Sequence, residues 1–529
     1  MKPRLFLFLV ACITCRMAVG QIHVAISNPD TWSAQDLAPY VGQTVIFDDP
    51  LVVSSNSGSN YTISPRRLFT PSNQAYPNTS AYRSVVSLNG SAAMSLSGVP
   101  MVHPIHRCGE RIYHLQAKVN STSSLTWISG EWRGNSRADL EAGIPDVGDY
   151  RLLVCTMNLE YFLSVDFNPN SSMGPDNPAE HAKQCVKINK ALKLINADVY
   201  GFVEIQQGQA ALAELADSLN AKLPARNYTY IDDGSVANGT YTKSGFLYDA
   251  NVLEPVGQLQ EDNTKVQNRK KMICFKERAT GERFIFSVNH FKAKSGNGSG
   301  ADANQNDGQG GYNATRVAEA QSVMERYSRY KTAIREKDFL VMGDLNAYAK
   351  EDPITTFTSN GMIDLHRSFH ADSSYSYQFA GLAGYLDHAL CNSTLFPQVT
   401  GVAGFHINSD EHDNYTYDGK WSDNSMFRCS DHDPVLVGLR LDSTLVYDPS
   451  PVLNSLEIIS GESDVLTISN AVKEGKRSFY AIYSISGMPL GSGEITDTRQ
   501  LVELPKSPGM YIVYVYFDDR VYKHKVLVR

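Results

Sequence analysis

The chain has 529 residues, of which 42% are hydrophobic, an ordinary share for a globular protein and enough length for roughly two to four domains. Its formal net charge of −8 at pH 7 excludes a broad basic surface that would hold nucleic acid by electrostatics alone. A phosphate-bearing substrate would have to be met by a metal cation and a few local Lys, Arg and His side chains.

The first 20 residues have the pattern of an export signal. Lys2 and Arg4 precede the apolar run 5–10, and Ala18-Val-Gly20 matches a cleavage site. A lipoprotein cleavage box ending at Cys12 is the alternative, but the apolar run before it is very short. We therefore expect an ordinary signal peptide over residues 1–20. No later stretch is long and apolar enough to span a membrane.

Residues 22–148 are rich in Ser, Thr, Asn and Val and contain short runs in which hydrophobic residues alternate with polar ones. These runs lie at 44–47, 51–53, 112–115 and 125–128. Alternation of this kind is typical of half-buried strands, so we predict a small all-β domain. The charges, Gly and Pro of residues 131–150 indicate a linker.

Between residues 150 and 441, apolar strand-like runs alternate with helical patterns. The strand-like runs lie at 152–155, 198–203, 284–288, 339–342, 385–386 and 435–437. Helices are predicted at 178–195, where Asn177 precedes Pro178 as a cap, at 210–219 and at 316–336. This alternation predicts a layered domain with a sheet core.

The last part of the chain changes character again. A linker with two prolines covers 442–455, and short strands are predicted at 478–483, 500–504, 509–516 and 521–528. The turn 486–491, the segment 508–513 and the ending 523–529 resemble the C-terminal sorting domain of type IX secretion, a small β-sandwich. The resemblance implies that residues 450–529 engage the type IX secretion machinery, and that the protein is secreted or displayed on the outer-membrane surface of a Gram-negative bacterium.

Six strand-like segments of the central region adjoin polar residues. These residues are Asn158 and Glu160, Glu204, His290, Asp344 and Asn346, Asp387, and Asp431 and His432. A single Asp or Asn at such a position is most often a turn residue or a helix cap. A set of six, with a Glu, two His and several Asp, is much harder to attribute to turns. We expect these groups to gather along one edge of the sheet core.

Together these residues offer carboxylates, amides and imidazoles. Carboxylate and amide oxygens are ligands for a hard divalent cation, and an imidazole titrates near neutral pH. This combination is the chemistry of metal-assisted cleavage of phosphate esters.

The order of these residues, with the motifs Gly343-Asp-Leu-Asn346 and Ser430-Asp-His432, resembles the endonuclease/exonuclease/phosphatase superfamily, whose fold is deoxyribonuclease-I-like. The longer segments 307–316, 344–354, 375–377 leading to 386–390, and 406–411 resemble secreted bacterial extracellular nucleases of this superfamily. The resemblance covers 150–441 and implies an α+β protein with a four-layered α/β-sandwich. It also implies a metal-dependent endonuclease, a phosphodiesterase that acts as a monomer on extracellular DNA or RNA. The N-terminal β-domain loosely resembles the oligonucleotide-binding barrels that precede some secreted nucleases; a β-domain of another topology is the alternative.

The resemblance assigns roles to residues of the central domain. The metal would be Mg²⁺ or Mn²⁺, held by Asn158, Glu204 and Asp431, with a Ca²⁺ requirement left open. The catalytic residues would be His290, Asp344, Asn346, Asp387 and His432. Substrate would be contacted by Lys292, Tyr312 and Arg316.

Within this set, Asp344 and Asn346 would orient the attacking water, and Asp387 would help place the metal or an imidazole. His432, polarised by Asp431, and His290 would handle proton transfer. Further candidates are Glu160, His388 and His406 in the site, Lys294 as a phosphate contact, and Asp302 or Asp307 as calcium ligands. For His388 a packed strand histidine is the better interpretation.

Two rival functions remain open at this stage. A phosphodiesterase or phosphatase of the same superfamily acting on a lipid or inositol phosphate would use the same metal and histidines. An exported binding or adhesion protein with an inactive nuclease-like domain would have lost Glu204, Asp344 or His432, and all three are present.

Overall fold

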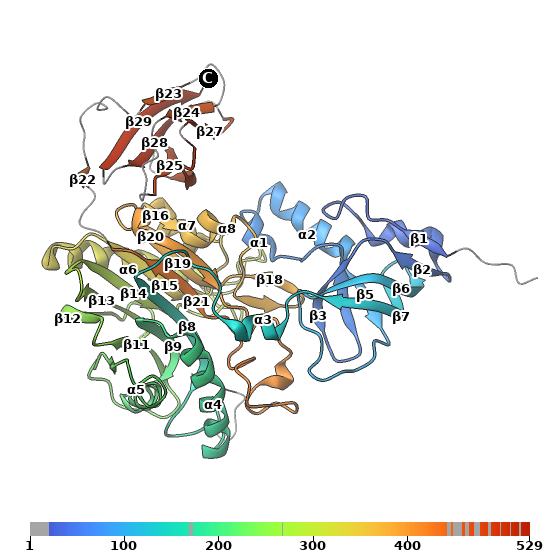
Figure 1. The fold of residues 1–529 in the computed structure, drawn as a ribbon, viewed down its shortest axis with the longest axis horizontal. Helices are drawn as coiled ribbons and strands as arrows, with labels where there is room; N and C mark the ends of the chain where they lie inside the picture. The colour runs from blue at the N-terminus through green and yellow to red at the C-terminus, as the bar shows by residue number, and fades with distance from the viewer. Residues whose placement is uncertain are drawn as a thin grey trace, which may run out of the picture.

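The computed structural model describes residues 21–168, 173–266, 268–441, 446–447, 457–460, 465–469, 477–484, 488–497, 499–507, 509–517 and 520–528. The predicted signal peptide 1–20 lies outside these residues, as does most of the predicted linker 442–455. A central body of stacked sheets is flanked by an N-terminal β-rich region and by a smaller C-terminal one (Figure 1). In the described part of the chain, no helix has the length and apolarity to cross a membrane.

Two six-stranded sheets form the central body. The strand order of the first sheet is β10 (Tyr228–Tyr230), β11 (Thr242–Asp249), β9 (Val199–Gln206), β8 (Leu152–Phe162), β21 (Val435–Leu439) and β20 (Val399–Gly404). The order of the second is β12 (Leu253–Asp262), β13 (Lys270–Glu277), β14 (Arg283–Asn289), β15 (Phe339–Asp344), β19 (Asp387–Asn392) and β16 (Met362–Asp364).

Helices cover both outer faces of this pair of sheets. Val154, Phe286 and Met342 belong to the apolar core between the sheets. The helices α4 (Pro178–Ile195) and α5 (Ala210–Lys222) pack on the first sheet. The helices α6 (Asn313–Ile334) and α7 (Asp352–Ser359) pack on the second. The predicted four-layered α/β-sandwich is therefore confirmed.

Strand direction explains why the polar residues gather at one edge. β8 and β9 are parallel and joined through α4, and β14 and β15 are parallel and joined through α6. The carboxyl ends of these strands meet at the same edge of the sandwich. β19 and β21 run antiparallel to their neighbours, so their first residues lie at that edge, where Asp387 pairs with Asp344.

Two details of the predicted strands are wrong. β8 continues to Phe162, so Asn158 and Glu160 lie inside the strand rather than after it. Residues 385–386 are not a strand, and Asp387 is the first residue of β19.

The helix predictions hold to within a few residues. α4 has the predicted bounds because the Asn177 side chain accepts hydrogen bonds from two main-chain N–H groups and Pro178 occupies the first turn. α6 begins three residues before the predicted start. There Asp302 accepts hydrogen bonds from the main-chain N and side-chain Oγ1 of Thr315, at 2.8 and 2.7 Å.

The N-terminal region contains a seven-stranded sheet. Its order is β1 (Ile22–Val24), β2 (Thr44–Phe47), β6 (Arg111–Ser121), β3 (Leu51–Asn56), β4 (Tyr61–Ser64), β5 (Met94–Ser97) and β7 (Ser124–Arg133). An additional pairing of β6 with β7 closes β3, β4, β5, β7 and β6 into a five-stranded barrel, in which β5 and β7 are parallel. Five-stranded Greek-key barrels are the architecture of oligonucleotide-binding folds.

The N-terminal region is not all-β. It also contains the helices α1 (Pro71–Gln74), α2 (Ser80–Ala92) and α3 (Arg137–Ala142). α2 buries only Asn89 and Ala92, although Ala81, Val85 and Leu88 recur in its sequence at helical spacing. The predicted linker 131–150 is wrong in part, because it includes the end of β7 and all of α3.

The C-terminal region contains two further sheets. One has the order β22 (Val446–Tyr447), β29 (Arg520–Val528), β28 (Gly509–Phe517), β25 (Phe479–Ser484) and β26 (Pro489–Glu494), and the other β23 (Glu457–Ser460), β24 (Val465–Ser469) and β27 (Arg499–Glu503). Apolar residues of both sheets, among them Ile468, Val502 and Val513, form a separate core. The strands predicted here are confirmed.

Candidate active site

The carboxylate of Asp344 is the centre of the candidate site. Its Oδ2 lies 3.4 Å from Asn158 Nδ2 and 3.4 Å from Asn346 Nδ2. The same oxygen lies 3.8 Å from His290 Nε2 and 3.9 Å from His432 Nε2. Residues from both sheets thus converge on one oxygen, as the sequence predicts.

Local backbone geometry aims these side chains. Asn346, Glu160 and Glu204 have φ angles of 48°, 48° and 57°, in the left-handed region that residues other than glycine rarely adopt. Each such residue costs about 1–3 kcal/mol, and strain of this kind concentrates at functional sites. Gly343 is required for another reason: a Cβ there would lie 2.2 Å from the Asn289 carbonyl oxygen, so only glycine lets β14 and β15 end this close together.

His432 is held by Asp387. Its Nδ1 lies 2.7 Å from Asp387 Oδ2, which also accepts a hydrogen bond of 2.7 Å from Ser376 Oγ. Asp431 is more distant, with Oδ2 3.8 Å from His432 Nε2. The prediction that Asp431 polarises His432 is therefore wrong. Asp387 is the carboxylate that polarises this imidazole. Burial disfavours a charged His432, but the nearby carboxylates, Asp387 first, raise its pKa well above the usual value.

His290 has a looser environment. Its Nε2 lies 3.5 Å from Glu204 Oε1, beyond a good hydrogen bond. Burial and the positive charges of Arg269 and His432 lower the pKa of His290 well below its usual value. The surroundings therefore shift the pKa values of the two imidazoles in opposite directions, up for His432 and down for His290.

The carboxylates of the site fit a divalent cation. Burial and repulsion from Asp431 raise the pKa of Glu204 to about 7, and the same causes raise the pKa of Glu160. Burial and repulsion from Asp387 also raise the pKa of Asp344. Oε2 of Glu160 is buried, and no described residue hydrogen-bonds to it. A buried group of hard oxygen donors is what Mg²⁺ or Mn²⁺ prefers.

The predicted substrate residues divide into two groups. Lys292 Nζ lies 4.6 Å from the centre of the Tyr312 ring, and both side chains are partly exposed, so both can reach a ligand. Arg316 is fully buried and donates hydrogen bonds to the carbonyl oxygens of Gln309, Gly311 and Lys292. The structure thus contradicts the predicted role of Arg316, which holds the Gly-rich loop in place.

Several secondary candidates also have structural roles. Lys294 is bound to the buried carboxylate of Glu351, so its charge is already neutralised. Both oxygens of Asp302 accept hydrogen bonds from Thr315, and those of Asp307 accept from Gln309.

His388 is a packed strand histidine, as expected. It is completely buried, its Nε2 lies 2.7 Å from the Ala347 carbonyl oxygen, and burial lowers its pKa to about 4. His406 stacks on Tyr375 at 3.7 Å, and its Nδ1 lies 2.9 Å from Asp433 Oδ2. It supports the loop beside His432 rather than facing Asp344.

Three residues near the site were missed from the sequence. Arg269, in the loop before β13, supplies a positive charge beside Glu204 and His290. The Tyr377 ring stacks on the His432 ring, with centroids 4.6 Å apart and planes at 29°. Arg428 lies next to Glu160, whose charge raises its pKa although burial opposes this. Only Tyr377 had a signal, because it belongs to the segment 375–377 that precedes Asp387.

A cleft of about 430 Å³ opens beside these residues. It is lined by Asp431 and Arg428 at the site, by Tyr377 and Phe379 of the hairpin β17 (Tyr377–Phe379) and β18 (Leu382–Gly384), and by Asn56 of the barrel. The cleft therefore joins the candidate site to the N-terminal barrel.

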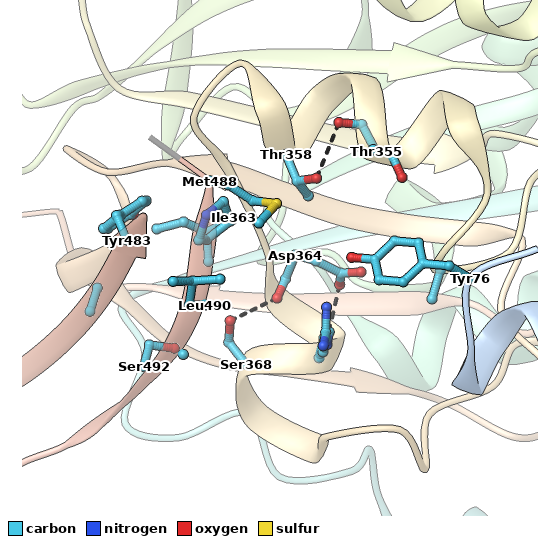
Figure 2. Close-up of a pocket in the computed structure, with 15 residues that line it drawn as sticks. Tyr76, Thr355, Thr358, Ile363, Asp364, Ser368, Tyr483, Met488, Leu490 and Ser492 are labelled. Carbon is cyan, nitrogen blue, oxygen red and sulfur yellow. Dashed lines mark hydrogen bonds between the residues drawn. The ribbon is translucent and has the colours of Figure 1, made fainter. Parts of the chain in front are cut away.

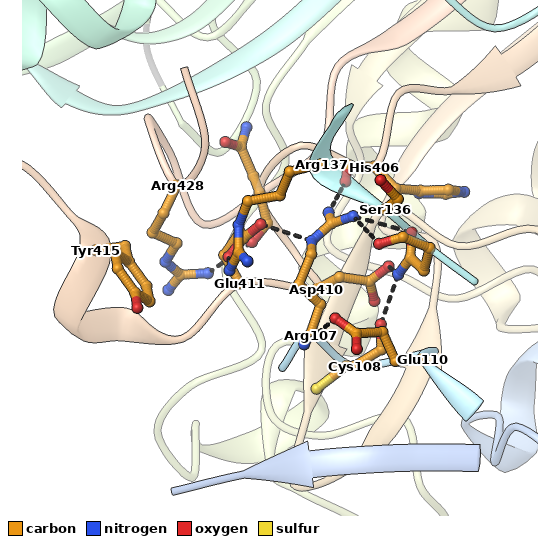
Figure 3. Close-up of polar contacts among 12 residues, drawn as sticks. Arg107, Cys108, Glu110, Ser136, Arg137, His406, Asp410, Glu411, Tyr415 and Arg428 are labelled. Carbon is orange, nitrogen blue, oxygen red and sulfur yellow. Dashed lines mark hydrogen bonds and ion pairs between the residues drawn. The ribbon is translucent and has the colours of Figure 1, made fainter. Parts of the chain in front are cut away.

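Buried ion pairs fix the barrel next to the site. Arg107 Nε lies 2.6 Å from Glu411 Oε1, and both side chains are completely buried. Arg137 pairs with the same carboxylate (Figure 3). Arg67 pairs with Asp410. The segment that carries these carboxylates also binds the loop of His432: Asn408 Nδ2 donates to the His432 carbonyl oxygen at 2.7 Å.

A second pocket, of about 190 Å³, lies between the central body and the C-terminal sheets (Figure 2). Asp364 and Ser368 line it on one side, and Tyr483, Met488 and Leu490 on the other. None of the predicted site residues lines this pocket.

Fold and site together define a phosphoesterase of the deoxyribonuclease-I-like class. The model of the Endonuclease/Exonuclease/phosphatase family matches residues 159–432, a little over half of the chain, and the chain belongs to this family. Hydrolysis of phosphate esters with the help of a divalent cation is the general chemistry of the family.

Solved structures match part of this chain at low identity. An endonuclease/exonuclease/phosphatase from Bacteroides vulgatus is 18% identical, with a TM-score of 0.38 over 55% of this chain and 99% of that chain. A mannosyl-6-phosphatase from Bacteroides thetaiotaomicron is 18% identical, with a TM-score of 0.38 over 55% and 100%. TDP2 of D. rerio, complexed with a single-strand DNA product, is 13% identical, with a TM-score of 0.36 over 55% and 99%. A search of curated proteins finds no match. Identities this low leave the substrate open.

Proposed function

We propose that this protein is an exported, metal-dependent nuclease that hydrolyses phosphodiester bonds of DNA. Family membership supplies the reaction class, which is hydrolysis of a phosphate ester. The proposal that the substrate is a nucleic acid, rather than another phosphate ester, rests on the cleft beside the site.

The cleft has the features of a channel for a flexible strand. It extends from Asp431 past the hairpin of Tyr377 and Phe379 to Asn56 of the barrel, which is farther than one phosphate group requires. Phe379 is 65% exposed. Exposed aromatic rings along such a cleft can stack on bases, and each stacked base contributes about 1–3 kcal/mol. A small sugar or inositol phosphate would leave these rings unused.

The residues of the site suit Mg²⁺ or Mn²⁺. Glu204, Asn158 and Asp431 would hold the ion, and the orphan carboxylate oxygen of Glu160 is a fourth candidate ligand. When bound, the cation would neutralise charge on the phosphate and stabilise the transition state.

The remaining residues position water and protons. Asp387 binds Nδ1 of His432, so only Nε2 of this imidazole faces Asp344 and the reacting groups. The Asp344 carboxylate would accept a hydrogen bond from the attacking water, and the Asn346 side chain would help to orient this water. His290 faces the same point from the second sheet, so the two imidazoles can serve the attacking and leaving oxygens.

Sequence patterns near both ends of the chain support the proposal that the protein is exported. The pattern of residues 1–20 is that of a signal peptide, and the C-terminal segments 486–491, 508–513 and 523–529 resemble a type IX sorting domain. Described residues of 457–528 form two packed sheets, the architecture that such a domain would need.

The first test is a digest of single-stranded DNA, double-stranded DNA, RNA and a small phosphomonoester after metal removal by a chelator. We expect no cleavage until Mg²⁺ or Mn²⁺ is restored, and then cleavage of DNA. Full activity after exhaustive chelation would overturn the metal-assisted mechanism. Cleavage of the phosphomonoester alone would show that the protein is a phosphatase.

The second test separates the site from the cleft. His432→Ala should lower kcat by about 10² or more while DNA binding survives, because the imidazole acts on the reacting groups. Phe379→Ala should raise the KM for long single-stranded DNA about tenfold and leave hydrolysis of a minimal phosphodiester unchanged. Tyr241→Ala is the matched control, because Tyr241 is also 65% exposed and does not line the cleft. Equal effects of the Phe379 and Tyr241 changes would contradict the proposed strand path.

A further inference from the structure

Three side chains with metal-ligand chemistry meet on the outer face of the first sheet, and none of them is a candidate active-site residue. His181 and Cys185 are one turn apart on α4, and Glu214 lies opposite them on α5. His181 Nε2 lies 3.3 Å from Cys185 Sγ and 2.9 Å from Glu214 Oε2, and Cys185 Sγ lies 3.2 Å from Glu214 Oε1. The two helices lie side by side over this sheet (Figure 1).

The contacts converge on one point rather than forming a relay. In a Cys–His–carboxylate relay the thiol and the carboxylate contact different nitrogens of the imidazole. Here both contact Nε2, and no described residue hydrogen-bonds to the buried Nδ1 of His181. The three donor atoms therefore surround a common centre, which is the arrangement of ligands around an ion.

The triangle formed by the donor atoms has the size of one face of a tetrahedral zinc site. Bonds of about 2.3 Å to sulfur and about 2.0–2.2 Å to nitrogen and oxygen give ligand separations of about 3.3–3.6 Å. With Oε1 of Glu214 as the carboxylate ligand, the observed separations are 3.0, 3.2 and 3.3 Å, shorter by a few tenths of an ångström at most. Small side-chain adjustments would therefore admit the ion.

The surroundings favour a soft ion with access from solvent. The rings of Phe162 and Phe167 pack against His181, at centroid distances of 4.9 and 5.8 Å. The Glu214 side chain is 37% exposed, so one side of the cluster opens to water. A thiolate and an imidazole select Zn²⁺ over Mg²⁺, unlike the oxygen-rich candidate active site.

We propose that His181, Cys185 and Glu214 bind Zn²⁺, with water as the fourth ligand, and that the ion joins α4 to α5. Without the ion, Cys185 Sγ donates its hydrogen bond to Glu214. Zinc binding displaces this proton to solvent, so binding should weaken as the pH falls. Because α4 connects β8 to β9, the ion would stabilise the sheet that carries Asn158 and Glu204 without taking part in the reaction.

Cobalt provides a direct test, because a thiolate bound to Co²⁺ gives a near-ultraviolet charge-transfer band. The candidate active site contains no cysteine, so it does not contribute to this band. We expect metal-free full-length protein to gain the band with one equivalent of Co²⁺, even in excess Mg²⁺, and to lose it when Zn²⁺ is added. Absence of the band in the folded wild-type protein would overturn the proposal.

Variants assign the ligands. Cys185→Ser should abolish the band, and His181→Asn and Glu214→Gln should weaken Co²⁺ binding at least tenfold. Asp217→Asn is the matched control, because it changes an exposed carboxylate on the same helix, and it should bind normally. In parallel, Zn²⁺ should raise the Tm of wild-type and Asp217→Asn protein but not that of Glu214→Gln. An unchanged band in Cys185→Ser, or an equal Tm shift in Glu214→Gln, would overturn the assignment.

Discussion

The N-terminal barrel and the C-terminal sheets are attached to the central sandwich in opposite ways. The barrel is joined by buried charges: Arg107 and Arg137 pair with Glu411 (Figure 3), and Arg67 pairs with Asp410. The C-terminal sheets are joined by apolar side chains. Phe479 packs against Phe396 at 6.3 Å, and Phe479, Ala481, Tyr483 and Tyr516 belong to the same apolar cluster as the core between the central sheets.

This difference bears on what each attachment can do. Buried ion pairs and hydrogen bonds require defined directions, so they fix the orientation of the groups that they join. The carboxylates that receive the arginines lie in the segment whose Asn408 binds the main chain of His432. Apolar contact depends mainly on area and is less directional. The barrel is thus coupled to the site geometry, whereas the C-terminal sheets contribute burial.

The largest effect should come from breaking the charged attachment. Glu411→Ala would leave Arg107 buried without its partner, and removing one partner of a buried pair costs about 3–5 kcal/mol. Urea unfolding should show this loss, and DNA cleavage should fall in the protein that remains folded. Glu141→Ala, an exposed carboxylate on α3, should change neither. A loss of stability with normal kcat would show that the interface does not position the site.

The apolar attachment should respond differently. Phe479→Ala removes a side chain that is 5% exposed, and a change of this type costs about 3–5 kcal/mol in a packed core. We expect a lower Tm with unchanged kcat. A lowered kcat at a temperature where the protein is folded would contradict the separation of the two attachments.

A smaller effect is expected from the surface pair next to Phe479. Arg477 pairs with Glu494 at 2.8 Å, but both side chains are more than a third exposed. Pairs of this kind contribute about 0–1 kcal/mol. Glu494→Ala removes this pair but keeps the hydrogen bond from Arg477 to the Thr400 carbonyl oxygen, so it should change the urea midpoint much less than Phe479→Ala does. Equal shifts would mean that the surface pair contributes as much as the apolar contact.

The two attachments also show what the sequence can predict. Local signals were sufficient for α4, where Asn177 and Pro178 mark the start of the helix. The order of the polar residues was sufficient to group Asn158, Glu204 and Asp344, because parallel strands end at one edge.

Contacts across the fold were not predictable in this way. Asp387 and His432 are brought together by the pairing of separate strands, and the adjacent Asp431 was the misleading choice. An arginine near a helix start, such as Arg316, can face a ligand or bind its own loop, and only packing decides. The pairing of Arg107 with Glu411 spans two regions and left no local pattern.

Deletion of residues 450–529 should have the smallest effect on catalysis. No described residue after Leu441 contacts the candidate site, and the C-terminal sheets have their own core. The deletion exposes Phe396 and neighbouring apolar residues, so we expect lower stability and more aggregation. The kcat for DNA measured on the monomeric fraction should match that of the full chain, whereas release or surface display should be lost in a host with the type IX system. If catalysis is lost while circular dichroism shows an intact central domain, the C-terminal sheets complete the active site. In that case it is wrong that only the barrel influences the geometry of the site.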